Sequence, residues 1–345
     1  MPDPPPIRVD ILARTDTSPS TLFGLYDVLS SVGVGWETFV SGKPEVPRFD
    51  VRIIAASERP FRCAGGVLVS PKAGLEDAGQ ADVAIVASLV TPSWAPPRKC
   101  DEREMGWLSQ QQSRGAVVAS ACTGAIVLAE SGLLNGLEAT THWAYGDLFR
   151  VHYPDVRLRL EKNLCLAGRN EEIVTSGGAT GWQELALHLI VRFCGVKYAT
   201  RAARFWLIPN QEEYQSPYAA LLPRGIPHDD GIVKDCQLWI ADNYAQTNPV
   251  SRMTLKSGVP PATFARRFKR ATGYHPMNYV HALRVEEAKQ MLETTDQAID
   301  EIGHEVGYED PASFRRLFKR KTMLTPAAYR RRFGKARFER YELSK

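Results

Sequence analysis

Short apolar runs alternate with longer amphipathic stretches over the first 200 residues of the chain. The short runs, each predicted to form a strand, are 7–12, 51–55, 83–87, 116–120 and 173–175. The amphipathic stretches, each predicted to form a helix, are 21–31, 125–134 and 182–193. Strands that alternate with helices are typical of a mainly parallel sheet covered by helices. We therefore expect an α/β domain over residues 7–200.

The pattern loosens after residue 200 and then becomes helical. Residues 201–231 predict a linker, because three prolines and two glycines fall between Pro217 and Gly231. Helical periodicity then continues over 232–335, which we expect to form an all-α domain, and residues 336–345 form a basic tail. A chain of 345 residues is long enough for two such domains.

The second domain contains an internal repeat with an offset of fifty residues. Segments 262–279 and 312–329 are identical at nine of eighteen aligned positions. Each copy predicts a short helix, a turn at Gly258 or Gly307, and a second helix. The stretch 276–293 predicts a helix of roughly 27 Å that joins the copies. The repeat therefore predicts two helix-turn-helix units, and the second helices of such units enter successive major grooves about 34 Å apart.

The second helix of each copy has an apolar and a basic face. Phe264 and Phe268, and Phe314 and Phe318, recur at four-residue spacing and are predicted to pack inward. The opposite faces carry Ala262, Ala265, Arg266, Lys269 and Arg270 in the first copy and Ala312, Arg315, Arg316, Lys319 and Arg320 in the second. Small residues allow a close approach to a groove, and arginine binds guanine or phosphate. We expect the second copy, with its additional arginine, to be the more basic.

Charge separates between the two halves. Residues 232–345 contain 21 Lys and Arg against 13 Asp and Glu, whereas residues 1–231 contain 22 against 26. Such asymmetry indicates a polyanion-binding module. Six cysteines are scattered without metal-ligand spacing, so we expect reduced thiols, no metal and no cofactor. No apolar stretch approaches the ~18 residues of a membrane helix, and we expect a cytoplasmic, nucleoid-associated protein that binds no membrane.

Residues 258–276 and 302–330 together resemble the DNA-binding domain of the AraC/XylS family of transcription regulators. The resemblance covers both halves of the family domain and implies binding to double-stranded DNA. The residues that it implies as base or phosphate contacts are Ala262, Thr263, Ala265, Arg266, Lys269, Ala312, Ser313, Arg315, Arg316 and Lys319. Two positions depart from the repeat: Arg267 stands where the second copy has Leu317, and Met323 replaces a glycine.

A strand, a sharp turn of small residues and a helix follow one another over 117–128. Cys122 falls at the turn, where an elbow exposes a side chain at the carboxyl end of a parallel sheet. We expect the start of the following helix to lower the pKa of the thiol and to favour bound anions. His142 follows twenty residues later and is expected to approach the thiol. A cysteine and a histidine in this arrangement indicate nucleophilic catalysis or a ligand pocket.

Segment 120–143, with a later glycine cluster, resembles the amidotransferase-like, PfpI-type domains that are fused to many AraC-family regulators. The resemblance implies a flavodoxin-like parallel sheet sandwich. Related hydrolases place histidine directly after the cysteine, whereas this chain has Thr123, and residues 18–22 lack the acidic partner of those hydrolases. We therefore interpret Cys122, Thr123 and His142 as the wall of a ligand pocket, with no catalytic residue. A buried structural thiol and a catalytic nucleophile are the alternatives.

Three functions are consistent with these patterns. The leading hypothesis is a sequence-specific DNA-binding transcription activator that responds to a small metabolite, works with RNA polymerase and forms a homodimer. The family resemblance implies amino-acid-derived or quaternary-amine effectors. The alternative is a cysteine hydrolase or amidase fused to a DNA-binding domain, and in a third interpretation the first domain serves dimerisation only.

Overall fold

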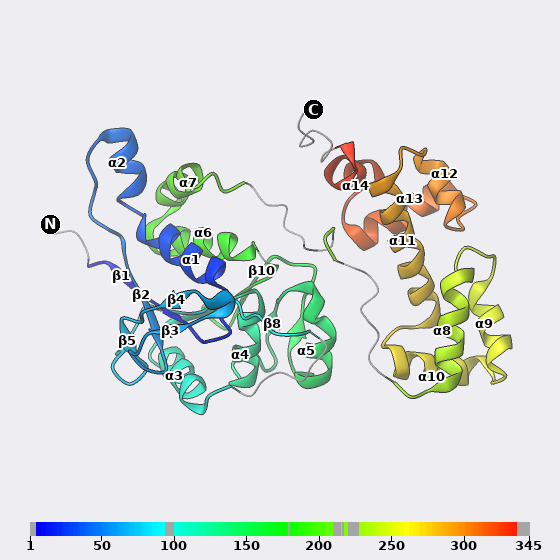
Figure 1. Ribbon diagram of the computed structural model, residues 1–345, viewed down its shortest axis with the longest axis horizontal. Helices are drawn as coiled ribbons and strands as arrows, with labels where there is room; N and C mark the ends of the chain where they lie inside the picture. Colours follow the sequence, from blue (N-terminus) through cyan, green and yellow to red (C-terminus); the bar gives the residue numbers. More distant parts are fainter. Residues whose placement is uncertain are drawn as a thin grey trace. The chain divides into compact units, whose positions relative to one another are not determined.

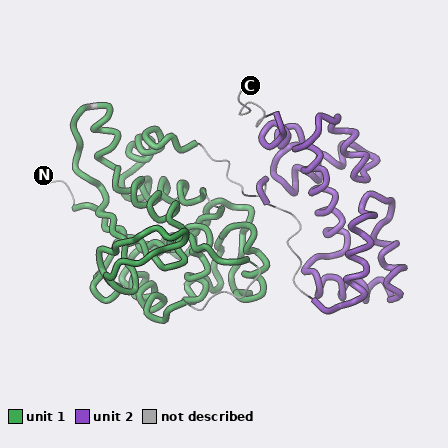
Figure 2. The backbone as a smooth tube through the Cα atoms, in the orientation of Figure 1, with its two compact units in different colours: residues 1–215 green, residues 216–345 purple. Residues whose placement is uncertain are grey.

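The computed structural model describes residues 5–93, 100–178, 180–209, 215, 217–219 and 228–336. They fall into two units, 1–215 and 216–345, each with its own hydrophobic cores (Figures 1 and 2). Within these described ranges, no helix has both the length and the apolar character needed to cross a bilayer.

A seven-stranded sheet in the order β10-β11-β7-β6-β1-β2-β5 forms the centre of the first unit (Figure 1). Its strands are β1 (Ile7–Leu12), β2 (Phe49–Ala55), β5 (Ala73–Gly74), β6 (Val83–Val86), β7 (Val117–Ala121), β10 (Leu164–Ala167) and β11 (Ile173–Ser176). Neighbouring strands are parallel except β10, which runs antiparallel to β11. Two further sheets have two short strands each: β3 (Phe61–Arg62) pairs with β4 (Leu68–Val69), and β8 (Glu138–Ala139) pairs with β9 (Arg157–Leu158). The predicted, mainly parallel α/β sheet is confirmed.

Side chains of the central strands alternate between two cores, one on each face of the sheet. Val83 and Ile85 of β6 belong to one core, whereas Ala84 and Val86 of the same strand belong to the other. Both faces are therefore buried. This is why the central strands are continuous apolar runs in the sequence rather than alternating ones.

Helices cover both faces of the sheet (Figure 1). One core contains side chains of α1 (Pro19–Ser30), α6 (Gly181–Cys194) and α7 (Val196–Phe205), and the other contains side chains of α3 (Glu102–Ser113), α4 (Ala125–Glu130) and α5 (Gly146–His152). The remaining helical segments are α2 (Gly35–Ser41), η1 (Ala64–Gly66), η2 (Cys122–Gly124) and η3 (Trp143–Tyr145). A Cβ atom on Gly24 would lie 2.6 Å from the ring of Trp182, so this glycine lets α1 and α6 pack closely.

The predicted linker begins with an ordered helix, because α7 continues through Phe205. Ala202 is buried in the core, and Arg201 forms a 2.6 Å ion pair with Glu37 of α2. These contacts are tertiary and leave no local sign in the sequence. Of the predicted linker and basic tail, residues 210–214, 216, 220–227 and 337–345 lie outside the described residues.

The described residues of the second unit form seven helices (Figure 1). They are α8 (Gly231–Asn243), α9 (Pro249–Ser257), α10 (Pro261–Thr272), α11 (Pro276–Thr294), α12 (Ile299–Glu305), α13 (Pro311–Thr322) and α14 (Pro326–Phe333). The pairs α9–α10 and α12–α13 are the two predicted helix-turn-helix units. Phe264 and Phe268 are buried in one core, and Phe314 and Phe318 in the other, as their spacing predicts.

The long helix α11 joins the two cores of this unit. Val280 packs into the first core, whereas Val285, Ala288 and Leu292 pack into the second. Arg284, between these two sets, is buried and donates hydrogen bonds to the backbone carbonyls of Tyr244, Gln246 and Gly307 at 2.8, 3.0 and 2.9 Å. One side chain thus connects α11 to the end of α8 and to the turn of the second helix-turn-helix.

The two copies differ where their second helices end. Gly273 and Met323 both adopt the left-handed conformation, with φ of 76° and 62°. Glycine adopts this conformation without cost, whereas the side chain of methionine crowds the backbone. Met323, which replaces the glycine of the first copy, therefore strains the end of α13 but keeps the same left-handed turn.

We expect Met323→Gly to raise the free energy of unfolding by about 1 kcal/mol, because glycine relieves this strain. Urea unfolding of the full chain measures the change in the transition of the second unit. Met323→Ala, which removes the same contacts but keeps the strain, is the matched control and should give no gain. Equal effects of the two substitutions would contradict the explanation.

Candidate nucleic-acid interface and effector pocket

The exposed faces of α10 and α13 carry the residues that the sequence predicts to contact DNA. Ala262, Arg266 and Lys269 are exposed on α10, as are Ala312, Arg315, Arg316 and Lys319 on α13. Thr263, Ala265 and Ser313 are half-buried at the edges of these faces. Each face lies opposite the buried phenylalanines of its own helix.

Carboxylates offset part of the additional charge of the second copy. Arg315 lies 2.5 Å from Asp300 of α12, and Arg316 lies 3.6 Å from Asp310 and 2.8 Å from the hydroxyl of Ser313. In contrast, Arg266 forms no ion pair with any residue that the structure describes. The additional arginine of the second face is thus partly neutralised by ion pairs, and the expectation that this face is the more basic one stays a prediction.

The second difference between the copies is Arg267, which stands where the second copy has Leu317. Its guanidinium donates a hydrogen bond to the carboxylate of Asp230, which lowers the pKa of Asp230. Asp230 also accepts a hydrogen bond from the backbone N–H of Val233 and so caps α8. Where the second copy buries Leu317, the first copy therefore has an ion pair that holds α10 against the start of α8.

The turn formed by Cys122, Thr123 and Gly124, which we call the elbow, is closely packed. Cys122 follows β7 with a φ of 55°, a strained value for a residue with a side chain. A Cβ atom on Gly124 would lie 2.4 Å from the carbonyl oxygen of Val86, so only glycine fits there. The hydroxyl of Thr123 donates to the carbonyl of Leu89 at 2.6 Å and accepts from its N–H at 2.7 Å. Thr123 therefore fastens the elbow to the loop after β6.

Burial determines the direction in which the pKa of the Cys122 thiol shifts. The residue is only 6% exposed, and desolvation raises the pKa of the thiol, while the hydroxyls of Ser88 and Thr123 oppose that rise only in part. The expected lowering of this pKa by the following helix is wrong. Removal of water disfavours the thiolate more than the short helix α4 favours it.

His142 caps a short helix beside the elbow region. Its Nδ1 accepts a hydrogen bond from the N–H of Ala144 at 3.1 Å and so caps the short helix η3, and burial lowers the pKa of the imidazole. Within the described part of the chain no hydrogen bond joins it to the thiol of Cys122. Thr141 contacts the elbow instead, because its hydroxyl donates to the carbonyl of Cys122 at 2.9 Å.

A polar notch lies beside the elbow, and sequence reasoning did not identify it. We define the notch as Thr140, Thr141, the carbonyl of Lys162, and Gly177 with Gly178. The amide side chain of Gln215, a residue of the predicted linker, fills it. The threonine pair was visible in the sequence, but a distant glutamine as its partner was not.

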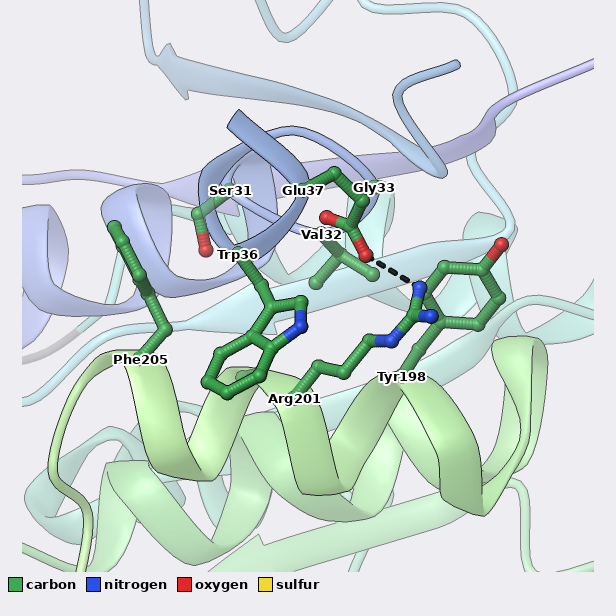
Figure 3. A pocket seen from close by; sticks show the side chains of 9 residues that line it. Ser31, Val32, Gly33, Trp36, Glu37, Tyr198, Arg201 and Phe205 are labelled. Carbon is green, nitrogen blue, oxygen red and sulfur yellow. Dashed lines mark hydrogen bonds and ion pairs between the residues drawn. The ribbon is translucent and has the colours of Figure 1, made fainter. Parts of the chain in front are cut away.

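A separate shallow hollow lies between the end of α1, α2 and α7 (Figure 3). Trp36 and Phe205 line it with their rings, and Arg201 reaches across it to Glu37 (Figure 3). Because Glu37 is buried and paired with Arg201, the hollow presents this carboxylate as an internal ion pair rather than as a free site. The elbow and the notch are therefore the stronger candidate site.

Comparison with known proteins finds a family match in each of the two units. The family model described as DJ-1/PfpI family matches residues 20–192, and the model described as helix-turn-helix domain matches residues 254–332. The HTH-type transcriptional regulator CdhR of Pseudomonas aeruginosa is 24% identical over 283 residues, which cover 80% of each chain. Isonitrile hydratase of Pseudomonas putida is 30% identical over 193 residues, 56% of this chain and 75% of that enzyme. A solved AraC family transcriptional regulator from Pseudomonas putida aligns with a TM-score of 0.47 and 18% identity over 58% of this chain and 100% of that chain.

We expect Cys122 to react slowly with iodoacetamide at pH 7 to 8, because burial keeps its thiol protonated and shielded. Mass spectrometry of the native chain over a series of pH values measures the rate at each cysteine. Cys194, which is more exposed, is the internal reference. A Cys122 rate that exceeds that of Cys194 and levels off below pH 7 would show an activated thiolate and contradict the expectation.

Proposed function

The chain belongs to the DJ-1/PfpI family, and we propose that its family domain is a sensor whose small effector controls the C-terminal DNA-binding domain. The chain is a DNA-binding transcription regulator with an AraC-type helix-turn-helix domain. A regulator is supported over an enzyme, because the similarity to CdhR extends over most of the chain, whereas isonitrile hydratase matches about half of it.

The observation that carries the DNA-binding function is the duplicated basic face. Helix α11 has 19 residues, about 28 Å at 1.5 Å per residue, which is close to the roughly 34 Å between successive major grooves. Arg284 of this helix bonds the end of α8 and the turn of the second helix-turn-helix unit. The proposed base and phosphate contacts are Ala262, Thr263, Ala265, Arg266, Lys269, Ala312, Ser313, Arg315, Arg316 and Lys319.

The proposed effector site is the elbow region with Cys122, Thr123 and His142, in a non-catalytic role. The raised pKa of the thiol, the capping role of His142 and the backbone contacts of Thr123 all favour a structural pocket wall over a nucleophile. The effector is amino-acid-derived or a quaternary amine. The regulator acts in the cytoplasm as a homodimer and activates transcription together with RNA polymerase.

Alanine substitutions on α10 and α13 should separate base reading from phosphate binding. Arg266→Ala and Arg316→Ala should each cost about 1–3 kcal/mol at one base position. Lys269→Ala and Lys319→Ala should weaken binding to all sequences and reduce the slope of log K against log salt by about 1. Fluorescence anisotropy on DNA selected by the protein, with single-base variants over a salt series, measures both effects.

The exposed Arg103→Ala in the first unit is the control for this series and should leave DNA binding unchanged. Unchanged binding in all four variants of α10 and α13 would refute the DNA-contact assignment.

Cys122→Ala should preserve both DNA binding and induction, because the pocket does not require a nucleophile. Genome-wide mapping of bound DNA supplies a natural promoter, and a reporter gene on that promoter measures induction in cells. Induction of the variant should stay within about twofold of the parent, well below the effect of removing a nucleophile. A variant that binds DNA normally but no longer responds would favour the amidase or hydrolase alternative.

A further inference from the structure

Gln215 is anchored inside the first unit although it belongs to the predicted linker. The residue is only 3% exposed, and its Nε2 donates to the hydroxyl of Thr140 at 3.1 Å and to the carbonyls of Thr141 and Lys162 at 2.9 and 3.0 Å. Its Oε1 accepts from the N–H of Gly178 at 2.8 Å. A buried amide with both ends bonded is held specifically, because leaving either end without a partner there would be costly.

Gly177 leaves room for this amide. A Cβ atom on Gly177 would lie 2.0 Å from Nε2 of Gln215. The backbone of Gly177 does not have the positive φ that would by itself favour glycine, unlike that of Gly178. The absence of a side chain at position 177 therefore serves the occupant of the notch.

The notch shares its walls with the Cys122 elbow. Thr141, whose carbonyl accepts from Gln215, donates its hydroxyl to the carbonyl of Cys122. Thr140 donates its N–H to the hydroxyl of Thr175 at the end of β11. Thr140 and Thr141 of the notch thus lie beside the carboxyl ends of the parallel strands β7 and β11, where open α/β sheets bind their ligands.

We propose that this notch is a binding site for a primary carboxamide, and that Gln215 occupies it in cis until an effector carboxamide displaces it. The two N–H hydrogens of a carboxamide are shared among the three acceptors and its oxygen accepts from the Gly178 N–H, whereas an ionised carboxylate offers no hydrogen to the acceptors. Because Gln215 belongs to the linker, displacement releases the linker from the first unit at this point. The inference rests on the proposed sensor function and specifies the chemical group of its effector.

Removal of the internal occupant tests the site. In the full chain with Gln215→Ala, propanamide should refill the notch, raise the melting temperature and bind at least about tenfold more tightly than to the parent, in which Gln215 competes. Propanoate, of similar size but without donors, should do neither. Gln110→Ala, an exposed glutamine on α3, is the matched control and should behave as the parent.

A second pair of variants keeps the test independent of folding. Gln215→Glu keeps the side-chain size but should leave the notch, and it should gain propanamide binding as Gln215→Ala does. Adding Gly177→Ala to Gln215→Ala should abolish that binding, because the new Cβ would lie only 2.0 Å from the position of the amide nitrogen. Equal stabilisation by propanamide and propanoate, or unchanged binding in the double variant, overturns the proposal.

A reporter gene tests the link to regulation. Gln215→Ala should shift expression from a mapped promoter towards the induced level without inducer, and an unchanged uninduced level would overturn the proposed displacement. If the chain binds DNA and responds to its inducer, but the notch does not distinguish propanamide from propanoate, this inference alone is refuted. Loss of the DNA-contact assignment would instead refute the proposed function and leave the propanamide result intact.

Discussion

Buried backbone groups where the chain turns must find hydrogen-bond partners, and in this protein single side chains supply them. Arg284 is the strongest case, because its guanidinium satisfies three carbonyls from the end of α8 and from the turn between α12 and α13. Its guanidinium also lies 5.0 Å from the centre of the Tyr308 ring. Arg284 of the joining helix α11 thus helps to fix the end of α8 against the turn of the second helix-turn-helix unit, while Val280 and Val285 of the same helix pack into the two cores.

The same constraint shapes the first unit. Thr123 satisfies the backbone of Leu89, Thr141 satisfies the carbonyl of Cys122, and Gln215 satisfies the carbonyls of Thr141 and Lys162. The side chains that make these bonds are buried at the carboxyl end of the sheet. A dry environment raises the pKa of a thiol, so the packing that builds the notch also disfavours a reactive cysteine. The proposed recognition of a neutral polar group and the raised pKa of the thiol thus have the same physical cause, which is burial.

Local patterns made much of the fold predictable. The strands around Val83 and Val117 are apolar because both sheet faces are buried, and the duplicated phenylalanines of α10 and α13 mark the helix-turn-helix cores. The extension of α7 and the burial of Gln215 depend on contacts between residues far apart in the sequence. The antiparallel strand β10 was not predicted either, although it pairs with the next strand, β11, across a short loop. The Cys122 pKa was wrongly predicted because a sequence shows the helix start but not the burial that outweighs it.

The unequal charge of the two copies follows from the same balance between pairing and exposure. The Arg315–Asp300 pair leaves both side chains about half exposed, at 53% and 49%. Exposed pairs of this kind contribute at most about 1 kcal/mol, so phosphate can replace the carboxylate at little cost. The pairs therefore orient the arginines and reduce the free positive charge of α13 when no DNA is present. Non-specific attraction depends on that free charge, whereas base reading depends on geometry, so on the proposed DNA contacts we expect the second copy to gain specificity relative to affinity.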